Sequence, residues 1–224
     1  MTSGELADAI IVFDLDGTLV DTAPDLMRAL NQTMDLEGLP RAKLETVRGA
    51  VGQGARVLIE RAAALHGVSF TAERLDALVR EFIAFYSSDI ARDSKLYPGV
   101  LHAMDDLAAL GAKFAICTNK RTDLSLQLLD ALGAGERFST VVGADAVMQR
   151  KPHPEHYQAA VARAGGTVRR SMMIGDTVAD VGAARGAVAI AKADGACESL
   201  GADAIIDQYS QLAPVCRRLL AARP

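Results

Sequence analysis

Two aspartates end an apolar run near the start of the chain. Ile10 to Phe13 are followed by Asp14 and Asp16, and then by Gly17, in the stretch DLDGT. Alternate residues of an extended strand point to the same side, so both carboxylates can face one ligand, and the glycine lets the chain turn away sharply. Carboxylates are costly at the end of a buried strand unless something pairs with them. The stretch therefore predicts either a cation site or carboxylates that take part in chemistry.

A second apolar run ends in the same way. In MMIGDTVAD, Asp176 follows the run and a glycine, and Asp180 comes four residues later on the same face of the helix expected there. Three or four carboxylates in one crevice cannot all stay ionised without a counter-charge. Mg²⁺ that keeps some of its waters fits such oxygen ligands best. A calcium loop is a poorer interpretation, because Thr18 and Leu19 stand at its fifth and sixth positions and a strand precedes it.

Two further groups follow other apolar runs. AICTNK ends in Thr118 and Asn119, whose hydroxyl and amide suit phosphate oxygens, although in isolation a simple turn or capping box is the better explanation. QRKPHPEHY places Lys151 before two prolines that stiffen the loop and begin the next helix. A rigid loop is a poor place for a free surface charge, which favours a functional lysine. We interpret His153 as a loop or cap residue, since no second His or Cys lies at ligand spacing.

The elements that carry these residues alternate along the chain. Apolar runs such as AIIVFD, KFAICTN, TVVGAD, SMMIGD, AVAIAKA and DAIID are separated by stretches with helical periodicity. This order predicts an α/β fold with a doubly wound, Rossmann-like parallel sheet covered by helices on both sides. Ligands bind beyond the carboxyl ends of the strands in such sheets. The polar residues named above, and Asp145, lie at those ends, so we expect the active site there.

One segment breaks the alternation. Residues 23–92 contain helical patterns and no convincing strand, which predicts an all-α insertion over residues 21–93, between core segments 1–20 and 94–224. Within it, VGQGARVL has two glycines before a helix, which could hold an anion on backbone N–H groups. It lacks the strand and third glycine of a dinucleotide-binding loop.

Composition narrows the class of protein. The net charge is −4 and no block of Lys or Arg occurs, which argues against a nucleic-acid partner. No apolar run approaches the roughly 18 residues of a membrane span, and the N-terminus has no basic region typical of a signal peptide. Three well-separated cysteines, Cys117, Cys197 and Cys216, are typical of reduced thiols. We therefore expect a cytoplasmic protein without membrane partners, and both a monomer and a homodimer remain open.

The four motifs occur in a familiar order. DxDGT, strand-Thr-Asn, Lys-Pro and GDxxxD together resemble the haloacid dehalogenase-like (HAD) phosphatase superfamily, and the helical insertion resembles its small α-helical cap. The resemblance covers essentially the whole chain. The matching residues, in motif order, are Asp14 and Asp16, Thr118, Lys151, and Asp176 with Asp180.

The resemblance implies a role for each of these residues. Asp14 would attack phosphorus and form an aspartyl-phosphate, and Asp16 would protonate the leaving alcohol and then activate water. Mg²⁺ would be held by Asp14, the backbone carbonyl of Asp16 and Asp176, and Asp180 would orient the metal shell. Binding of the phosphoryl oxygens would fall to Thr118, Asn119 and Lys151.

The resemblance also limits the substrate. An acid at Asp16 favours phosphoester hydrolysis over dehalogenation or phosphonate cleavage, which need no such acid. DLDGTLVDT, VGQGARVLIERA, YPGV, CTNK and KPHPE are similar to the phosphoglycolate phosphatase branch. Arg48, Gln53 and Lys120 are candidates to bind the substrate carboxylate, whereas Arg56 fits a solvated helix face better. A small phosphorylated metabolite is therefore expected, with hydrolysis of a sugar phosphate or pyrophosphate, a sugar phosphomutase, or a non-catalytic phosphate-binding domain as alternatives.

The insertion is expected to act as a lid. A cap of this kind opens and closes over the site and excludes water that would consume the intermediate. DTAPD, where Asp21 marks the departure of the chain, and RDSKLYPG would be the two hinge segments.

Overall fold

A six-stranded parallel sheet forms the centre of the protein. The structure is a computed structural model that describes residues 4–192 and 200–221, except for the side chain of Arg48. The strand order is β5-β4-β1-β6-β7-β8, so β1 lies between β4 and β6, and every pairing is parallel. The strands are β1 (Ile10–Phe13), β4 (Lys113–Cys117), β5 (Thr140–Val142), β6 (Ser171–Gly175), β7 (Val188–Lys192) and β8 (Ala204–Ile206).

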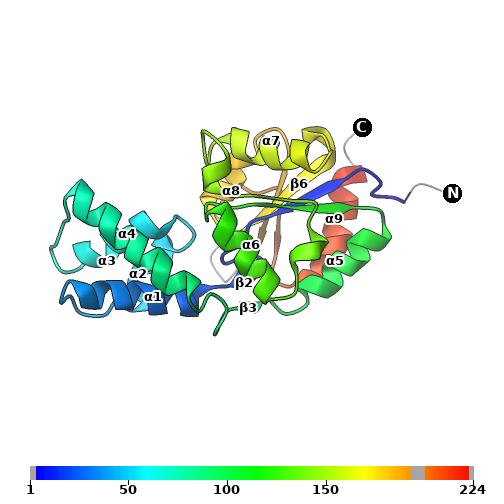
Figure 1. Ribbon diagram of the computed structural model, residues 1–224. Helices are drawn as coiled ribbons and strands as arrows, with labels where there is room; N and C mark the ends of the chain where they lie inside the picture. The colour runs from blue at the N-terminus through cyan, green and yellow to red at the C-terminus, as the bar shows by residue number, and fades with distance from the viewer. Residues whose placement is uncertain (1–3, 193–199, 222–224) are drawn as a thin grey trace.

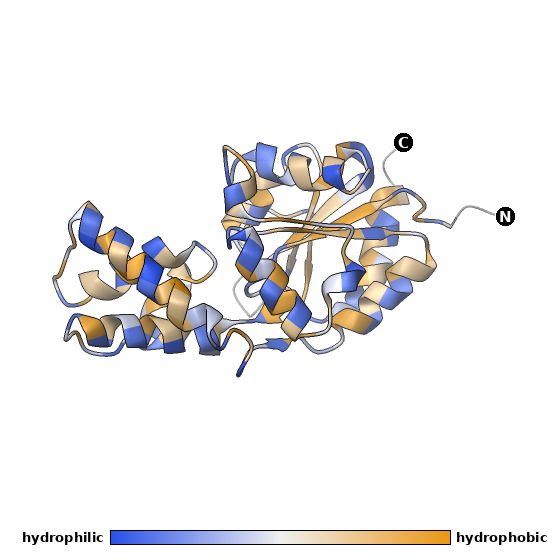
Figure 2. Cartoon of the chain, viewed as in Figure 1, coloured by the Kyte–Doolittle hydropathy of each residue, from blue (hydrophilic) through white to orange (hydrophobic). Residues whose placement is uncertain are grey.

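Helices cover both faces of this sheet, as the sequence predicts (Figure 1). Ile11 and Phe13 of β1 belong to the apolar cluster that includes the helices of one face, and Ile10 and Val12 belong to the cluster of the opposite face. This alternation follows from the two-residue repeat of a strand, and it explains why β1 is apolar throughout. Figure 2 shows apolar strands between helices that each carry one polar face. The helices are α5 (Val100–Ala109), α6 (Thr122–Ala131) and α9 (Leu212–Ala221) on the first face, and α7 (Pro154–Arg163) and α8 (Val178–Ala183) on the second.

The predicted insertion is helical. Four helices form a separate lobe beside the core (Figure 1), and no strand occurs among residues 23–92, all of which have a described backbone. Leu75, Leu78, Phe82 and Tyr86 of the longest helix are buried, and their spacing of three or four residues places them on one face. Full burial of each such side chain contributes about 1.5–3 kcal/mol. The helices are α1 (Ala23–Leu36), α2 (Leu44–Val47), α3 (Ala55–Ala64) and α4 (Ala72–Ser87).

A short antiparallel ribbon, β2 (Val20–Asp21) with β3 (Lys95–Leu96), connects this lobe to the core. Buried Asp25 at the start of α1 ties the two connections together, because its Oδ2 accepts hydrogen bonds from Ser94 N at 2.8 Å, Ser94 Oγ at 2.7 Å and Asp93 N at 3.0 Å. Burial opposes ionisation, but these bonds hold the pKa of Asp25 below its usual value. The predicted boundaries near residues 21 and 93 lie at this ribbon and stay a prediction.

Two further expectations can be compared with the structure. Cys117 and Cys216 are buried free thiols, and Cys197 lies outside the described residues. No helix in the described part of the chain is both long enough and apolar enough to cross a membrane.

Candidate active site

The carboxyl ends of three adjacent strands carry the predicted site residues. Asp14 follows β1, Thr118 follows β4 and Asp176 follows β6, and these strands are neighbours in the sheet. The Asp14 N–H continues the ladder by donating to Ile174 O at 2.9 Å, which fixes the direction of the carboxylate. Asp145, which the sequence also places at a strand end, instead accepts hydrogen bonds from Thr122 at the start of α6 and is not one of the clustered aspartates described next.

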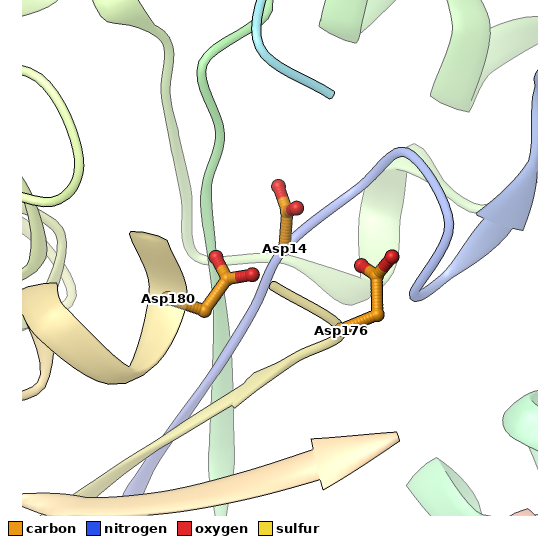
Figure 3. Close-up of side chains that lie close together, drawn as sticks. All are labelled: Asp14, Asp176 and Asp180. Carbon is orange, nitrogen blue, oxygen red and sulfur yellow. The ribbon is translucent and has the colours of Figure 1, made fainter. Parts of the chain in front are cut away.

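Three aspartates form a compact acidic cluster. Carboxylate oxygens of Asp14, Asp176 and Asp180 lie within 4.8 Å of one another, and Figure 3 shows the side chains gathered where β1 and β6 end. Burial, together with the neighbouring charges of Asp180 and Asp176, raises the pKa of Asp14 to about 8. Burial and the charge of Asp180 likewise raise the pKa of Asp176 to about 6. The cluster therefore requires positive charge if all three groups are to be ionised together.

Lys151 supplies part of that charge. Its Nζ lies 2.8 Å from Asp14 Oδ1 and 2.6 Å from Asp180 Oδ1, and the side chain is almost fully buried. Burial disfavours the ammonium, yet the two carboxylates raise the pKa of Lys151 above its usual value. One ammonium among three carboxylates leaves two negative charges uncompensated, the amount that one divalent cation would neutralise.

The donor set fits Mg²⁺. Both oxygens of Asp180 are already engaged, one by Lys151 and the other by the Thr177 N–H at 3.0 Å and hydroxyl at 2.6 Å. Asp180 thus suits an orienting role, and Asp14 with Asp176 could offer hard oxygen ligands to the ion. The close approach depends on Gly17, which has φ +84° and where an added Cβ would lie 2.5 Å from Asp176 Oδ2.

Asp16 forms an ion pair with a different lysine, Lys120. Lys120 Nζ lies 2.8 Å from Asp16 Oδ1, and the hydroxyl of Thr22 donates to the same oxygen at 2.7 Å. The ring of Tyr86, from cap helix α4, covers the Lys120 ammonium with its centroid 4.5 Å from Nζ. Burial disfavours the charge, but Asp16 and Tyr86 raise the pKa of Lys120 above its usual value.

The second motif, Thr118 and Asn119, is buried and has hydrogen bonds to the backbone of both lysines. Thr118 Oγ1 accepts a hydrogen bond from the Lys120 N–H at 3.2 Å. Asn119 Nδ2 donates to Lys151 O at 3.3 Å, while its buried Oδ1 has no hydrogen-bond partner among the described residues. Asn119 therefore joins the loop after β4 to the Lys151 loop, and its predicted contact with phosphate stays a prediction.

A cavity of about 80 Å³ lies between the core and the cap. The core contributes Asp16, Asn119 and Lys120 to its wall, and the cap contributes mostly apolar groups that include Phe82 and Tyr86. The Tyr86 hydroxyl is buried without a hydrogen-bond partner in the described structure. A buried hydroxyl without a partner is costly, and this one marks a polar point on the mostly apolar part of the wall that the cap contributes.

The residues that the sequence suggested for substrate binding do not all lie at the cavity. Lys120 lines the cavity, whereas the Gln53 side chain donates to Gly49 O within its own loop. Arg56 forms an ion pair with Asp76 inside the cap, in agreement with its interpretation as a surface residue. The side chain of Arg48 lies outside the described part of the chain.

Sequence reasoning missed Thr22 and Tyr86. Thr22 lies in DTAPD, six residues after Asp16, and an extended chain gives no sign that it turns back onto that carboxylate. Tyr86 belongs to an amphipathic helix pattern, in which a buried aromatic is ordinarily a packing residue.

Comparison with known proteins identifies the family. The model of the haloacid dehalogenase-like hydrolases matches residues 9–187. The chain belongs to this family. A phosphoglycolate phosphatase of Caulobacter vibrioides is 44% identical to it, over 100% of this chain and 97% of that protein, and one of Agrobacterium fabrum is 37% identical over 100% and 98%. A crystal structure described as a predicted phosphoglycolate phosphatase from Haemophilus somnus has a TM-score of 0.86 at 28% identity, and the match covers 94% of this chain and 98% of that one. This haloacid dehalogenase-like hydrolase is accordingly a phosphoric monoester hydrolase.

Proposed function

We propose that the protein is a Mg²⁺-dependent phosphatase that hydrolyses 2-phosphoglycolate to glycolate and phosphate through an aspartyl-phosphate. The observation that carries the proposal is that Asp14 and Asp16 reach one crevice while each is paired with a different buried lysine. Two carboxylates held in separate environments suit two separate tasks.

Asp14 is the nucleophile. A carboxylate oxygen attacks phosphorus, the bond from phosphorus to the alcohol oxygen breaks, and an aspartyl-phosphate forms. Lys151, beside Asp14 Oδ1 at 2.8 Å, can hold the phosphoryl oxygens as charge builds up in transfer. Bound Mg²⁺, with ligands from Asp14, Asp176 and the backbone carbonyl of Asp16, would reduce the repulsion between nucleophile and phosphate.

Asp16 is the acid and base. It protonates the leaving alcohol oxygen, and then takes a proton from the water that attacks phosphorus of the aspartyl-phosphate. That second step releases inorganic phosphate and restores the Asp14 carboxylate. Thr22 and Lys120 support this role because they hold Asp16 at the cavity wall. Thr118 and Asn119 would contact the phosphoryl group, and Asp180 would orient the metal shell.

The cavity favours a small anionic leaving group. Its volume of about 80 Å³ suits a group of few atoms, and its wall presents the Lys120 ammonium and the unpaired Tyr86 hydroxyl. The carboxylate of 2-phosphoglycolate could accept a hydrogen bond from each. Full-length relatives named phosphoglycolate phosphatase support the same substrate.

A phosphate-release assay tests the proposal. The protein is given 2-phosphoglycolate, pyrophosphate, a sugar monophosphate and a phenyl phosphate, each with and without Mg²⁺. We expect Mg²⁺-dependent release of phosphate, fastest from 2-phosphoglycolate. Faster release from a sugar phosphate or pyrophosphate would reassign the substrate, phosphoryl transfer within a sugar without release would indicate a mutase, and no turnover of any ester would indicate a phosphate-binding domain.

A further inference from the structure

His156 is a buried titratable group that the proposed mechanism does not use. It lies in the first turn of α7 with no exposed surface. Its Nδ1 is 3.2 Å from the backbone N of Lys151, and its Nε2 is 3.0 Å from Val142 O at the end of β5. The imidazole therefore bridges a core strand and the backbone of the lysine that contacts Asp14.

The two partners determine the tautomer. A backbone N–H only donates, so Nδ1 must accept from Lys151, and a carbonyl oxygen only accepts, so Nε2 must carry the proton given to Val142. Burial, assisted by the charge of Lys151, lowers the pKa of His156 to about 4. The ring is thus neutral, with one proton on Nε2.

The Lys151 peptide is held on both sides. His156 accepts its N–H, and Asn119 Nδ2 donates to its carbonyl oxygen at 3.3 Å. These two bonds come from α7 and from the loop after β4, so the position of the Lys151 backbone is set by two parts of the core. From that position Nζ contacts Asp14 Oδ1 and Asp180 Oδ1 together, at 2.8 and 2.6 Å.

We propose that His156 is a positioning residue for Lys151: by accepting the Lys151 N–H at Nδ1, it sets the loop so that the ammonium meets the nucleophile and the phosphoryl group. This inference rests on the proposed role of Lys151 in phosphoryl transfer. Both hydrogen bonds of His156 go to backbone groups, and His156 is not among the residues that line the cavity, so it can act on the site through the loop. Misplacement of a positioned group by about 1 Å can cost about 10²-fold in rate.

A pair of substitutions separates positioning from packing. In His156→Asn, the amide oxygen can replace Nδ1 and accept from Lys151, while the bond to Val142 is lost. In His156→Gln, the amide nitrogen can replace Nε2 and donate to Val142, while the bond to Lys151 is lost. Each variant leaves one buried backbone group unpaired, so a merely structural role predicts similar effects on stability and on rate.

We expect kcat for phosphate release to fall about 30- to 100-fold in His156→Gln with KM little changed, and to stay within about threefold of the parent in His156→Asn. The matched control is His153→Asn, since His153 is an exposed cap of the same helix, and it should leave kcat unchanged. Unchanged kcat in His156→Gln, or equal losses in both variants that follow their melting temperatures, would overturn the proposal.

Two further measurements keep the outcome decisive. Lys151→Met tests the premise: if it keeps full activity, the proposed role of Lys151 fails, whatever the His156 variants do. If neither His156 variant folds, the ring ¹⁵N chemical shifts of His156 in the unaltered protein at pH 7 replace them. An Nε2-protonated neutral ring is expected, and an Nδ1-protonated or doubly protonated ring would overturn the proposal.

Discussion

The two sides of the crevice differ in how their polar groups are satisfied. On the core side, the Asp14 and Asp180 carboxylates share Lys151 and Asp16 is paired with Lys120, so that among the described residues only a neutral amide oxygen, Asn119 Oδ1, is left without a partner there. On the cap side, α4 presents apolar surface with a single buried hydroxyl, that of Tyr86, left without a partner in the described chain.

This difference separates two tasks. An unpaired buried charge costs several kcal/mol, so the core side holds its carboxylates against two lysines whether or not substrate is present, and the charge that remains is the amount a divalent cation would neutralise. Leaving a neutral hydroxyl without a hydrogen-bond partner costs less free energy, so it can stay unpaired until a ligand binds. We infer that the core side performs the phosphoryl transfer common to the family, and that the cap side selects the group attached to the phosphate.

The largest effect should come from the nucleophile. Asp14→Asn should lower kcat by at least about 10⁴-fold, because an amide does not attack phosphorus. The initial rate at saturating 2-phosphoglycolate measures the loss, and the melting temperature shows that the variant is folded. Substantial residual turnover would contradict the covalent route and the division of tasks built on it.

Removal of the metal should abolish activity on every substrate. The acidic cluster keeps two uncompensated charges beside Lys151, so chelation should stop turnover of 2-phosphoglycolate and phenyl phosphate alike, and added Mg²⁺ should restore both. Bound Mg²⁺ should also raise thermal stability, by about 2.7 kcal/mol at a concentration 100 times its dissociation constant. Activity that survives exhaustive chelation would show that Lys151 alone compensates the cluster.

A substitution on the cap side should affect the hydrolysis of 2-phosphoglycolate but not that of phenyl phosphate. Tyr86→Phe should raise KM for 2-phosphoglycolate about tenfold, the effect of about 1.4 kcal/mol, because it removes one hydrogen bond to a charged group. The kcat value and the turnover of phenyl phosphate should change little, and removal of the orphaned hydroxyl should leave the melting temperature unchanged or higher. An equal loss on both substrates would place Tyr86 with the catalytic groups.

The last prediction concerns stability in acid and does not involve turnover. The pKa of His156 is about 4 in the folded protein against 6.5 ordinarily, so its contribution to the free energy of unfolding is fully present above pH 6.5 and is lost as the pH falls toward 4. The loss is on the order of 3 kcal/mol. Denaturant unfolding of the parent and of His156→Asn at pH 7 and pH 4.5 measures it, since only the parent carries this group. Parallel behaviour of the two proteins would contradict a buried neutral imidazole.

Local sequence predicted the core side well. Asp14 and Asp176 directly follow strands that are neighbours in the sheet, and the carboxyl ends of parallel strands must meet, so spacing alone brings these two to one edge. Lys151 follows no strand directly; the prolines beside it indicated a rigid loop, but its contact with Asp14 is visible only in the structure. The cap side was less accessible to such reasoning. Tyr86 and Lys120 meet only because the helical lobe packs over the crevice, and Gln53 satisfies its amide on its own loop. Those contacts depend on tertiary packing, which a strand or helix pattern does not encode.

The preference between two matched esters tests the central claim most directly. Ethyl phosphate has a methyl group where 2-phosphoglycolate has its carboxylate. The groups that act on phosphorus therefore treat the two alike, and only the groups that face the carboxylate, Tyr86 of the cap and the Lys120 ammonium beneath its ring, can distinguish them. With Mg²⁺ present, the account predicts a kcat/KM at least about 10²-fold higher for 2-phosphoglycolate, because an ethyl group accepts no hydrogen bond from Tyr86 or from the Lys120 ammonium, which is already paired with Asp16. Equal kcat/KM values for the two esters would contradict it.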